Sequence, residues 1–91
     1  MTTNLTSVKI DPHGVAGSLQ QAVETLHTAE GELVLDFSSV LRIDTTAARA
    51  LQELADRADA RSARVVLRAV NIEIYKALKL LKLAQRFSFL S

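Results

Sequence analysis

Short apolar runs alternate with longer stretches of mixed character along this chain. Three runs resemble β-strands, at residues 5–10, 33–37 and 64–68, because they are short, rich in Leu, Val and Ile, and bounded by turn residues. The first run stops at Asp11-Pro12, which predicts a short edge strand ended by a proline turn. The run at 33–37 is nearly continuous, which predicts a strand covered on both faces, as in a parallel sheet.

The stretches between these runs carry apolar residues at helical spacing. The first helix is predicted to begin at Ser18, because Ser18 and Gln21 form a capping-box pattern. A second helix is predicted from near Asp44 to about Ala60. Its buried positions are expected to be Ala47, Leu51, Leu54, Ala55 and Ala58.

A third helix is predicted from Ile72 to about Leu83, with Asn71 as its amino-terminal cap. Residues 87–90 can form one further short extended piece. The order is β-α-β-α-β-α, which predicts an α/β fold: a small, mainly parallel sheet flanked by helices. One core is expected to hold Leu35, Leu51, Leu54, Val66 and Leu78.

Composition narrows the class of protein. A chain of 91 residues with 48% apolar residues predicts a single domain over 1–91 with an aliphatic core. The absence of cysteine excludes disulfides and zinc-thiolate sites. A net charge of +1 with 4% aromatic residues argues against a nucleic-acid binder. The polar start does not resemble a signal peptide, and no window reaches the roughly 18 apolar residues of a membrane span, so a cytoplasmic location is expected.

The sequence offers little material for catalysis. His13 and His27 are the only histidines, and neither lies near a serine in a recognisable nucleophile elbow. Three glycines cannot supply a phosphate-binding loop of the known kinds. We therefore expect a protein that is not an enzyme and that has no cofactor, no metal site and no catalytic residues.

The most informative stretch runs from Asp36 to Thr46. Taken alone, it is a connection from a strand to a helix in which Asp44 or Thr45 caps the second helix. That local interpretation accounts for an Asp-Thr pair without any further function.

The same stretch resembles the signature of the STAS family, which includes the anti-sigma factor antagonists of bacteria. In that signature an apolar strand ends in Asp or Asn, and Asp followed by two hydroxyl residues opens a helix. The matching positions here are Asp36, Asp44, Thr45 and Thr46, and the resemblance covers about Ser18 to Phe89. In the family, a partner kinase phosphorylates the first hydroxyl after the Asp. The resemblance therefore implies Thr45 as the phosphoacceptor, with Thr46 as its rival.

Three positions depart from the family pattern. Ala47 replaces the usual Gly, and the run Ala47-Ala48-Arg49 is similar to stressosome-type variants. The family's Gly-Leu in the third helix is Lys82-Leu83 here. The spacing near Gly14 is short, which implies that one N-terminal hairpin strand is missing.

The resemblance implies a protein-binding regulatory switch whose partner is an anti-sigma factor or a GHKL-type kinase. The alternative is a STAS subunit of a lipid-transport ABC or other transporter assembly, which would bind an ABC ATPase subunit without phosphorylation. The expected partner-binding residues are Asp36, Ser38, Ser39, Arg42, Asp44, Thr45, Thr46 and Arg49.

The third helix adds a feature that the family signature does not explain. Its basic residues form a predicted ridge of Lys76, Lys79, Lys82 and Arg86. The ridge is either a solvated face or a docking site for an acidic partner or an anionic membrane surface. Leu80, Leu81 and Leu83 cannot all face one core, so a homodimer contact is also an open interpretation.

Overall fold

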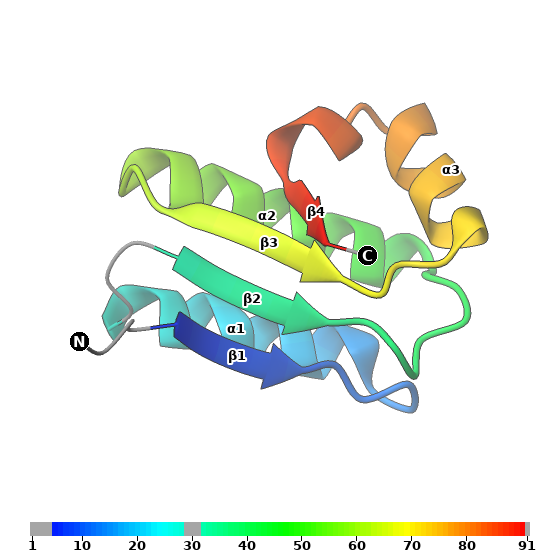
Figure 1. The fold of residues 1–91 in the computed structure, drawn as a ribbon, viewed down its shortest axis with the longest axis horizontal. Helices are drawn as coiled ribbons and strands as arrows, with labels where there is room; N and C mark the ends of the chain where they lie inside the picture. The colour runs from blue at the N-terminus through cyan, green and yellow to red at the C-terminus, as the bar shows by residue number, and fades with distance from the viewer. Residues whose placement is uncertain (1–4, 29–31, 91) are drawn as a thin grey trace.

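The structure, a computed structural model, describes residues 5–28 and 32–90 (Figure 1). The elements follow the order predicted from the sequence, and the last extended piece expected at 87–90 forms a short strand. They are β1 (Leu5–Lys9), α1 (Val15–Thr28), β2 (Glu32–Asp36), α2 (Thr45–Ala60), β3 (Arg64–Arg68), α3 (Ile72–Leu80), the 3₁₀ turn η1 (Ala84–Arg86) and β4 (Ser88–Leu90).

The four strands form one sheet in the order β1-β2-β3-β4, and each neighbouring pair is parallel. The predicted parallel α/β fold is confirmed, and β1 lies at an edge as expected. No antiparallel hairpin strand occurs within the described ranges. The carboxyl end of β2 therefore lies between those of β1 and β3, and the chain leaves the sheet there to reach α2.

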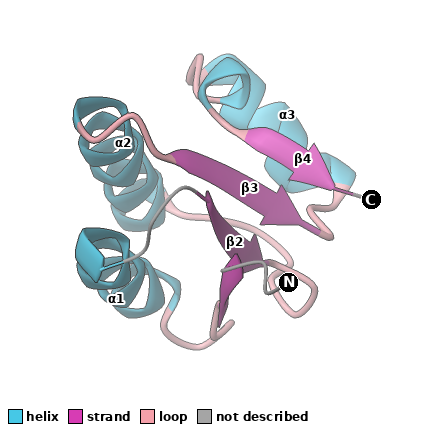
Figure 2. Ribbon diagram, turned by 60° about the vertical axis from the view of Figure 1, so that its left-hand side comes forward, coloured by secondary structure: helices cyan, strands magenta, loops and turns pink. Residues whose placement is uncertain are grey.

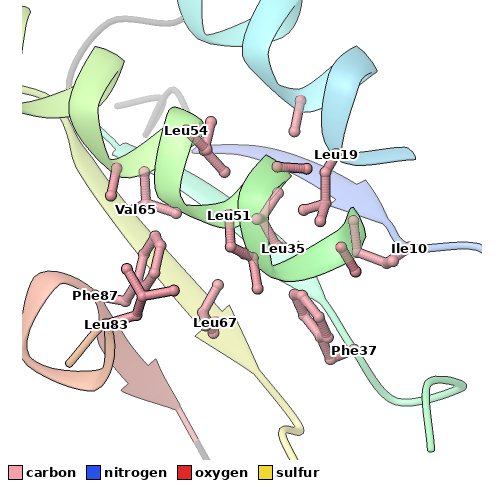
Figure 3. Packing of buried hydrophobic residues seen from close by; sticks show 14 of the residues in the cluster. Ile10, Leu19, Leu35, Phe37, Leu51, Leu54, Val65, Leu67, Leu83 and Phe87 are labelled. Atoms are coloured by element: carbon pink, nitrogen blue, oxygen red, sulfur yellow. The ribbon is translucent and has the colours of Figure 1, made fainter. Parts of the chain in front are cut away.

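One face of the sheet holds the hydrophobic core. Helices α1 and α2 cover this face and lie behind the sheet in the view of Figure 1. Figure 3 shows Leu51 and Leu54 of α2 pointing toward the strands. Helix α3 adds Ile74 and Leu78 to the same cluster of buried residues. The strands contribute Leu33, Leu35, Val65 and Leu67. The small residues of α2, including Ala47, Ala55 and Ala58, allow that helix to pack close to the sheet.

The other face of the sheet carries the buried Val34 and Val66 among charged and polar residues, and no helix of the described residues covers it in Figure 1. Val66 was predicted to share a core with Leu35, but it lies on this second face because it alternates with Val65 and Leu67. Beside it, Arg64 pairs with Glu32 at 3.6 Å and donates to the Ser88 hydroxyl at 3.0 Å. The run at 33–37 was predicted to be covered on both faces, and Leu33, Val34 and Leu35 are all buried there.

Helix α1 begins earlier than predicted, so Ser18 is not its cap. The Ser18 amide donates to the Gly14 carbonyl at 2.9 Å, and the Ser18 hydroxyl accepts from the Asp11 amide at 2.9 Å. The turn before the helix is closed by Asp11, whose carboxylate accepts from the His13 amide. This turn leads directly into the helix at Val15, three residues before the capping-box pattern.

Helix α3 ends at Leu80, three residues before the predicted end. Lys82 has a φ of 60°, in the left-handed region that glycine prefers. The Leu83 amide donates to the Leu78 carbonyl at 2.8 Å, which closes the helix end in the manner of a Schellman motif. The chain reverses at Lys82, and this turn buries Leu83 in the core.

Lys82→Gly should therefore stabilise the fold. The substitution removes the steric cost of a side chain at positive φ, and this gain exceeds the added freedom of the unfolded chain. We expect the free energy of unfolding to rise by up to about 1 kcal/mol, measured by urea denaturation. A loss of stability would mean that the helix does not end with a left-handed residue at position 82.

Candidate functional site

The loop between β2 and α2 is shaped by its own polar groups. The Asp36 carboxylate accepts from the Ser38 amide at 2.9 Å, and the Val40 amide donates to the Phe37 carbonyl at 3.0 Å. Phe37 and Val40 are buried and anchor the turn, which leaves Ser38 and Ser39 exposed at its tip. Asp36 was predicted to bind a partner, but it lies half-buried and its carboxylate closes this turn.

The pKa of Asp36 lies below its ordinary value. The largest cause is the hydrogen bonding from the backbone and side chain of Ser38, and partial burial opposes it. The positive charges of Arg68 and Lys9 lower this pKa further. Asp36 is therefore a carboxylate near neutral pH.

Asn71 fastens the same loop to the start of α3. Its side-chain amide donates to the Leu41 carbonyl at 2.9 Å and to the Val40 carbonyl at 3.3 Å. Its side-chain oxygen accepts from the Ile74 amide at 2.9 Å, which confirms the predicted cap. The contacts with the loop could not be predicted from local patterns, because the partners of Asn71 lie 30 and 31 residues away.

Two substitutions separate the roles of Asn71. Asn71→Asp keeps an oxygen for the Ile74 amide but removes the donor to the two loop carbonyls, whereas Asn71→Ala removes both. We expect Asn71→Ala to cost about 1–2 kcal/mol of stability. Both variants should speed amide hydrogen exchange in the loop around Val40. Unchanged exchange in Asn71→Asp would show that the loop does not depend on this amide.

Helix α2 begins at an Asp-Thr-Thr sequence in which the three residues differ in role. The Asp44 carboxylate accepts from the Ala47 amide at 2.8 Å, so Asp44 is the amino-terminal cap that the local interpretation predicted. Thr45 and Thr46 open the helix and are both exposed. Because Asp44 provides the cap, neither threonine is required for it.

The two threonines border different hollows. Thr45 borders a hollow of about 300 Å³ between α2 and α3. This hollow is mostly apolar, and two of its residues, Leu80 and Leu81, are 86% and 51% exposed. Its other lining residues are Ile43, Asp44, Ala48 and Ala77.

Thr46 borders a hollow of about 450 Å³ on the opposite side, between α2 and the turn that precedes α1. Arg42 and His13 lie in this second hollow, which is therefore more polar. The rest of its lining comes from residues 12–17 and Asp44. From the sequence, only the family resemblance separated Thr45 from Thr46. In the structure the two threonines also differ in their surroundings, because Thr45 borders the apolar hollow and Thr46 the more polar one.

The residues predicted to bind a partner gather at the carboxyl end of β2 and the first turns of α2. Seven of them are exposed: Ser38, Ser39, Arg42, Asp44, Thr45, Thr46 and Arg49. Leu80 and Leu81 were not predicted to belong to this surface, although the sequence shows that they cannot face one core together with Leu83. They reach it because α3 ends beside the start of α2.

The predicted basic ridge loses one of its members. Arg86 donates to the carboxylates of Asp59 and Asp56 on α2 at 2.5 and 2.9 Å, so it ties η1 to α2. These bonds, with Asp59 the stronger influence, raise the pKa of Arg86 above its usual value. The ridge prediction was therefore wrong for Arg86, and the basic residues that remain are Lys76 and Lys79 of α3 and Lys82 of the turn after it.

His13 is exposed in a turn, and the side chain of His27 lies outside what the structure describes. Within residues 5–28 and 32–90, no three His, Cys, Asp or Glu side chains are grouped to hold a metal ion. Every helix in these ranges is too short or too polar to cross a bilayer.

Comparison with known proteins extends these observations. No curated protein matches the chain. A sulfate transporter family protein from Wolinella succinogenes has a similar structure, with a TM-score of 0.79 and 22% identity over 98% of this chain and 79% of that one. A putative anti-sigma factor antagonist from Thermotoga maritima has a TM-score of 0.65 and 14% identity over 98% and 74% of the two chains.

At these identities the two structures support the fold alone. The family described as "Mlab, STAS domain" matches residues 9–90, which includes the Asp-Thr-Thr sequence and every element from α1 to β4. Domains of this family are in general binding and regulatory modules rather than enzymes. The chain belongs to the Mlab/STAS domain family.

Proposed function

We propose that this chain is a non-catalytic regulatory module that binds a partner protein through the surface around the start of α2, and that phosphorylation of Thr45 releases the partner. The observation that carries the proposal is the position of Thr45. It is an exposed hydroxyl at the first residue of a helix, beside an apolar hollow with two exposed leucines.

The apolar character of this hollow favours a protein partner. A side chain such as Leu80 gains about 1.5–3 kcal/mol when it is fully buried, and this gain is lost while it faces water. Leu81 and Ile43 extend the same surface, and Leu41 projects from the neighbouring loop. A partner that covers these residues would also cover the Thr45 hydroxyl.

The same geometry makes a phosphate at Thr45 effective. The amides and dipole of a helix start tolerate negative charge, so the modified chain would keep its fold. A phosphate adds up to two negative charges and would stand over the apolar hollow that the partner must desolvate. A phosphate on Thr46 would instead lie beside Arg42 and His13, where positive charge can accommodate it.

The partner under this proposal is an anti-sigma factor or a GHKL-type kinase, in the cytoplasm. The likeness to an anti-sigma factor antagonist is consistent with it. A second candidate is a constitutive subunit of a lipid-transport ABC or other transporter assembly, in which unmodified Thr45 contacts the ATPase. The match to the Mlab family and the likeness to a sulfate transporter family protein favour this candidate.

One experiment separates the two candidates. The purified chain is incubated with ATP and the GHKL-type kinase encoded nearest to it, and separately with the nearest ABC ATPase subunit. Phosphate is mapped by mass spectrometry, and complexes are detected by size-exclusion chromatography. Phosphate on Thr45 with loss of the complex supports the switch. A stable ATPase complex without any phosphate supports the constitutive subunit, and phosphate on Thr46 contradicts the assignment of Thr45.

A further inference from the structure

A second surface with unusual exposure lies on the flank of α3 that faces β4. Tyr75 of α3 and Phe89 of β4 meet edge to face, with ring centroids 5.3 Å apart at 78°. Beside them, Ile72 and Leu90 are 67% and 53% exposed. We call these four residues, together with Lys79 and Lys82, the α3–β4 surface. Figure 2 shows α3 and β4 side by side.

Two open hollows flank the aromatic pair. One, of about 330 Å³, is bordered by Ile72 and Leu90, together with Val70 and Asn71. The other, of about 370 Å³, is bordered by Lys79 and Lys82, together with Ala84 and Gln85. Tyr75 and Phe89 border both hollows, so apolar and cationic groups belong to one continuous surface.

The charge of this part of the chain differs from that of the rest. Between Ile72 and Leu90 there are four cationic residues and one acidic residue, whereas the other 72 residues carry seven cationic and nine acidic residues. Arg86 is already paired with α2. Lys76, Lys79 and Lys82 are exposed and form no ion pair within the described ranges.

We propose that the α3–β4 surface docks on an anionic membrane surface. Lysine stems can lie along apolar side chains while their ammonium groups reach lipid phosphates. Ile72, Leu90 and the two rings supply the apolar contact at the boundary between headgroups and acyl chains. A second copy of the chain fits less well, since it would bring another excess of positive charge against the first.

This inference does not depend on the proposed partner switch. The hollow beside Thr45 is bordered by Ala77 and Leu80, whereas the α3–β4 surface uses Ile72, Tyr75 and Lys79 on the other flank of the helix. The membrane contact would leave the Thr45 surface accessible to a partner. Failure of either proposal therefore leaves the other intact.

The test is flotation of the full chain with vesicles. We expect the protein to float with vesicles of equal parts phosphatidylcholine and phosphatidylglycerol at low salt, and not with phosphatidylcholine alone. Binding should fall as salt is raised, because salt screens the lysine–phosphate attraction.

Matched variants test whether this surface is responsible. Each lysine is expected to contribute about fivefold to partitioning, so Lys79→Gln with Lys82→Gly should weaken it by about 25-fold. Glycine at position 82 suits the left-handed backbone and protects the fold. Lys9→Gln with Arg49→Gln removes the same charge elsewhere, and this control should change partitioning by less than about threefold. Phe89→Ser tests the apolar contribution and should also weaken binding.

Two results would overturn the proposal. One is the absence of binding to anionic vesicles at low salt while circular dichroism shows a folded protein. The other is an equal loss of binding in the Lys9 and Arg49 control. In the first case, a shift of the amide resonances of Lys79 and Lys82 by polyglutamate would show that the surface serves an acidic protein segment.

Discussion

Leu54→Ala is expected to lower the free energy of unfolding by about 2–5 kcal/mol. Leu54 is completely buried on α2 and points from the helix toward the strands (Figure 3). The substitution removes three carbon atoms from a site that α1, α2 and the sheet enclose, so the loss combines transfer free energy with the cost of a cavity. The free energy of unfolding of folded proteins is about 5–15 kcal/mol, so this loss removes a large part of the stability of the fold.

The matched control is Leu80→Ala, which makes the same chemical change at a leucine that is 86% exposed. Its effect should stay within about 0.5 kcal/mol. Urea denaturation followed by circular dichroism measures both. A Leu54→Ala variant as stable as the Leu80→Ala control would mean that α2 presents a different face to the sheet.

Most of the fold could be predicted from the sequence because its signals are local. The apolar runs at 33–37 and 64–68 differ from the stretches between them in length and periodicity, and strands that alternate with helices require parallel crossovers. The errors arose where a few backbone bonds override a side-chain pattern. Asp11 closes the turn that starts α1 early. Lys82 ends α3 in the left-handed conformation, which a lysine in the sequence does not predict.

In the candidate site, too, the features that depend on neighbouring residues could be predicted, and those that depend on tertiary contacts could not. The role of Asp44 as a cap depends on an amide three residues away, so the pattern of residues was sufficient. The contribution of Leu80 depends on how α3 packs beside α2, and the hold of Asn71 on the loop joins residues about 30 positions apart. Neither could be read from spacing. The sequence therefore located the start of α2, while the tertiary structure determined what surrounds each threonine.

Thr45→Glu is expected to weaken partner binding by at least about tenfold, or about 1.4 kcal/mol, while leaving the fold intact. At the first residue of α2 a carboxylate is favoured by the helix dipole, so stability should stay the same or rise slightly. The loss arises at the interface, where the partner must desolvate a charge beside Leu80 and Leu81. Affinity is measured by isothermal titration with the partner identified by the phosphate-mapping experiment.

Thr46→Glu is the matched control, because it places the same charge one residue later on the same helix. Its side chain borders the hollow that holds Arg42 and His13, where a carboxylate meets positive charge rather than the exposed leucines. We expect Thr46→Glu to change affinity by less than about threefold. Thr45→Ala should bind normally but resist phosphorylation. If Thr46→Glu weakens binding as much as Thr45→Glu, the partner covers both hollows, and the separation of the two threonines that supports Thr45 as the switch would be lost.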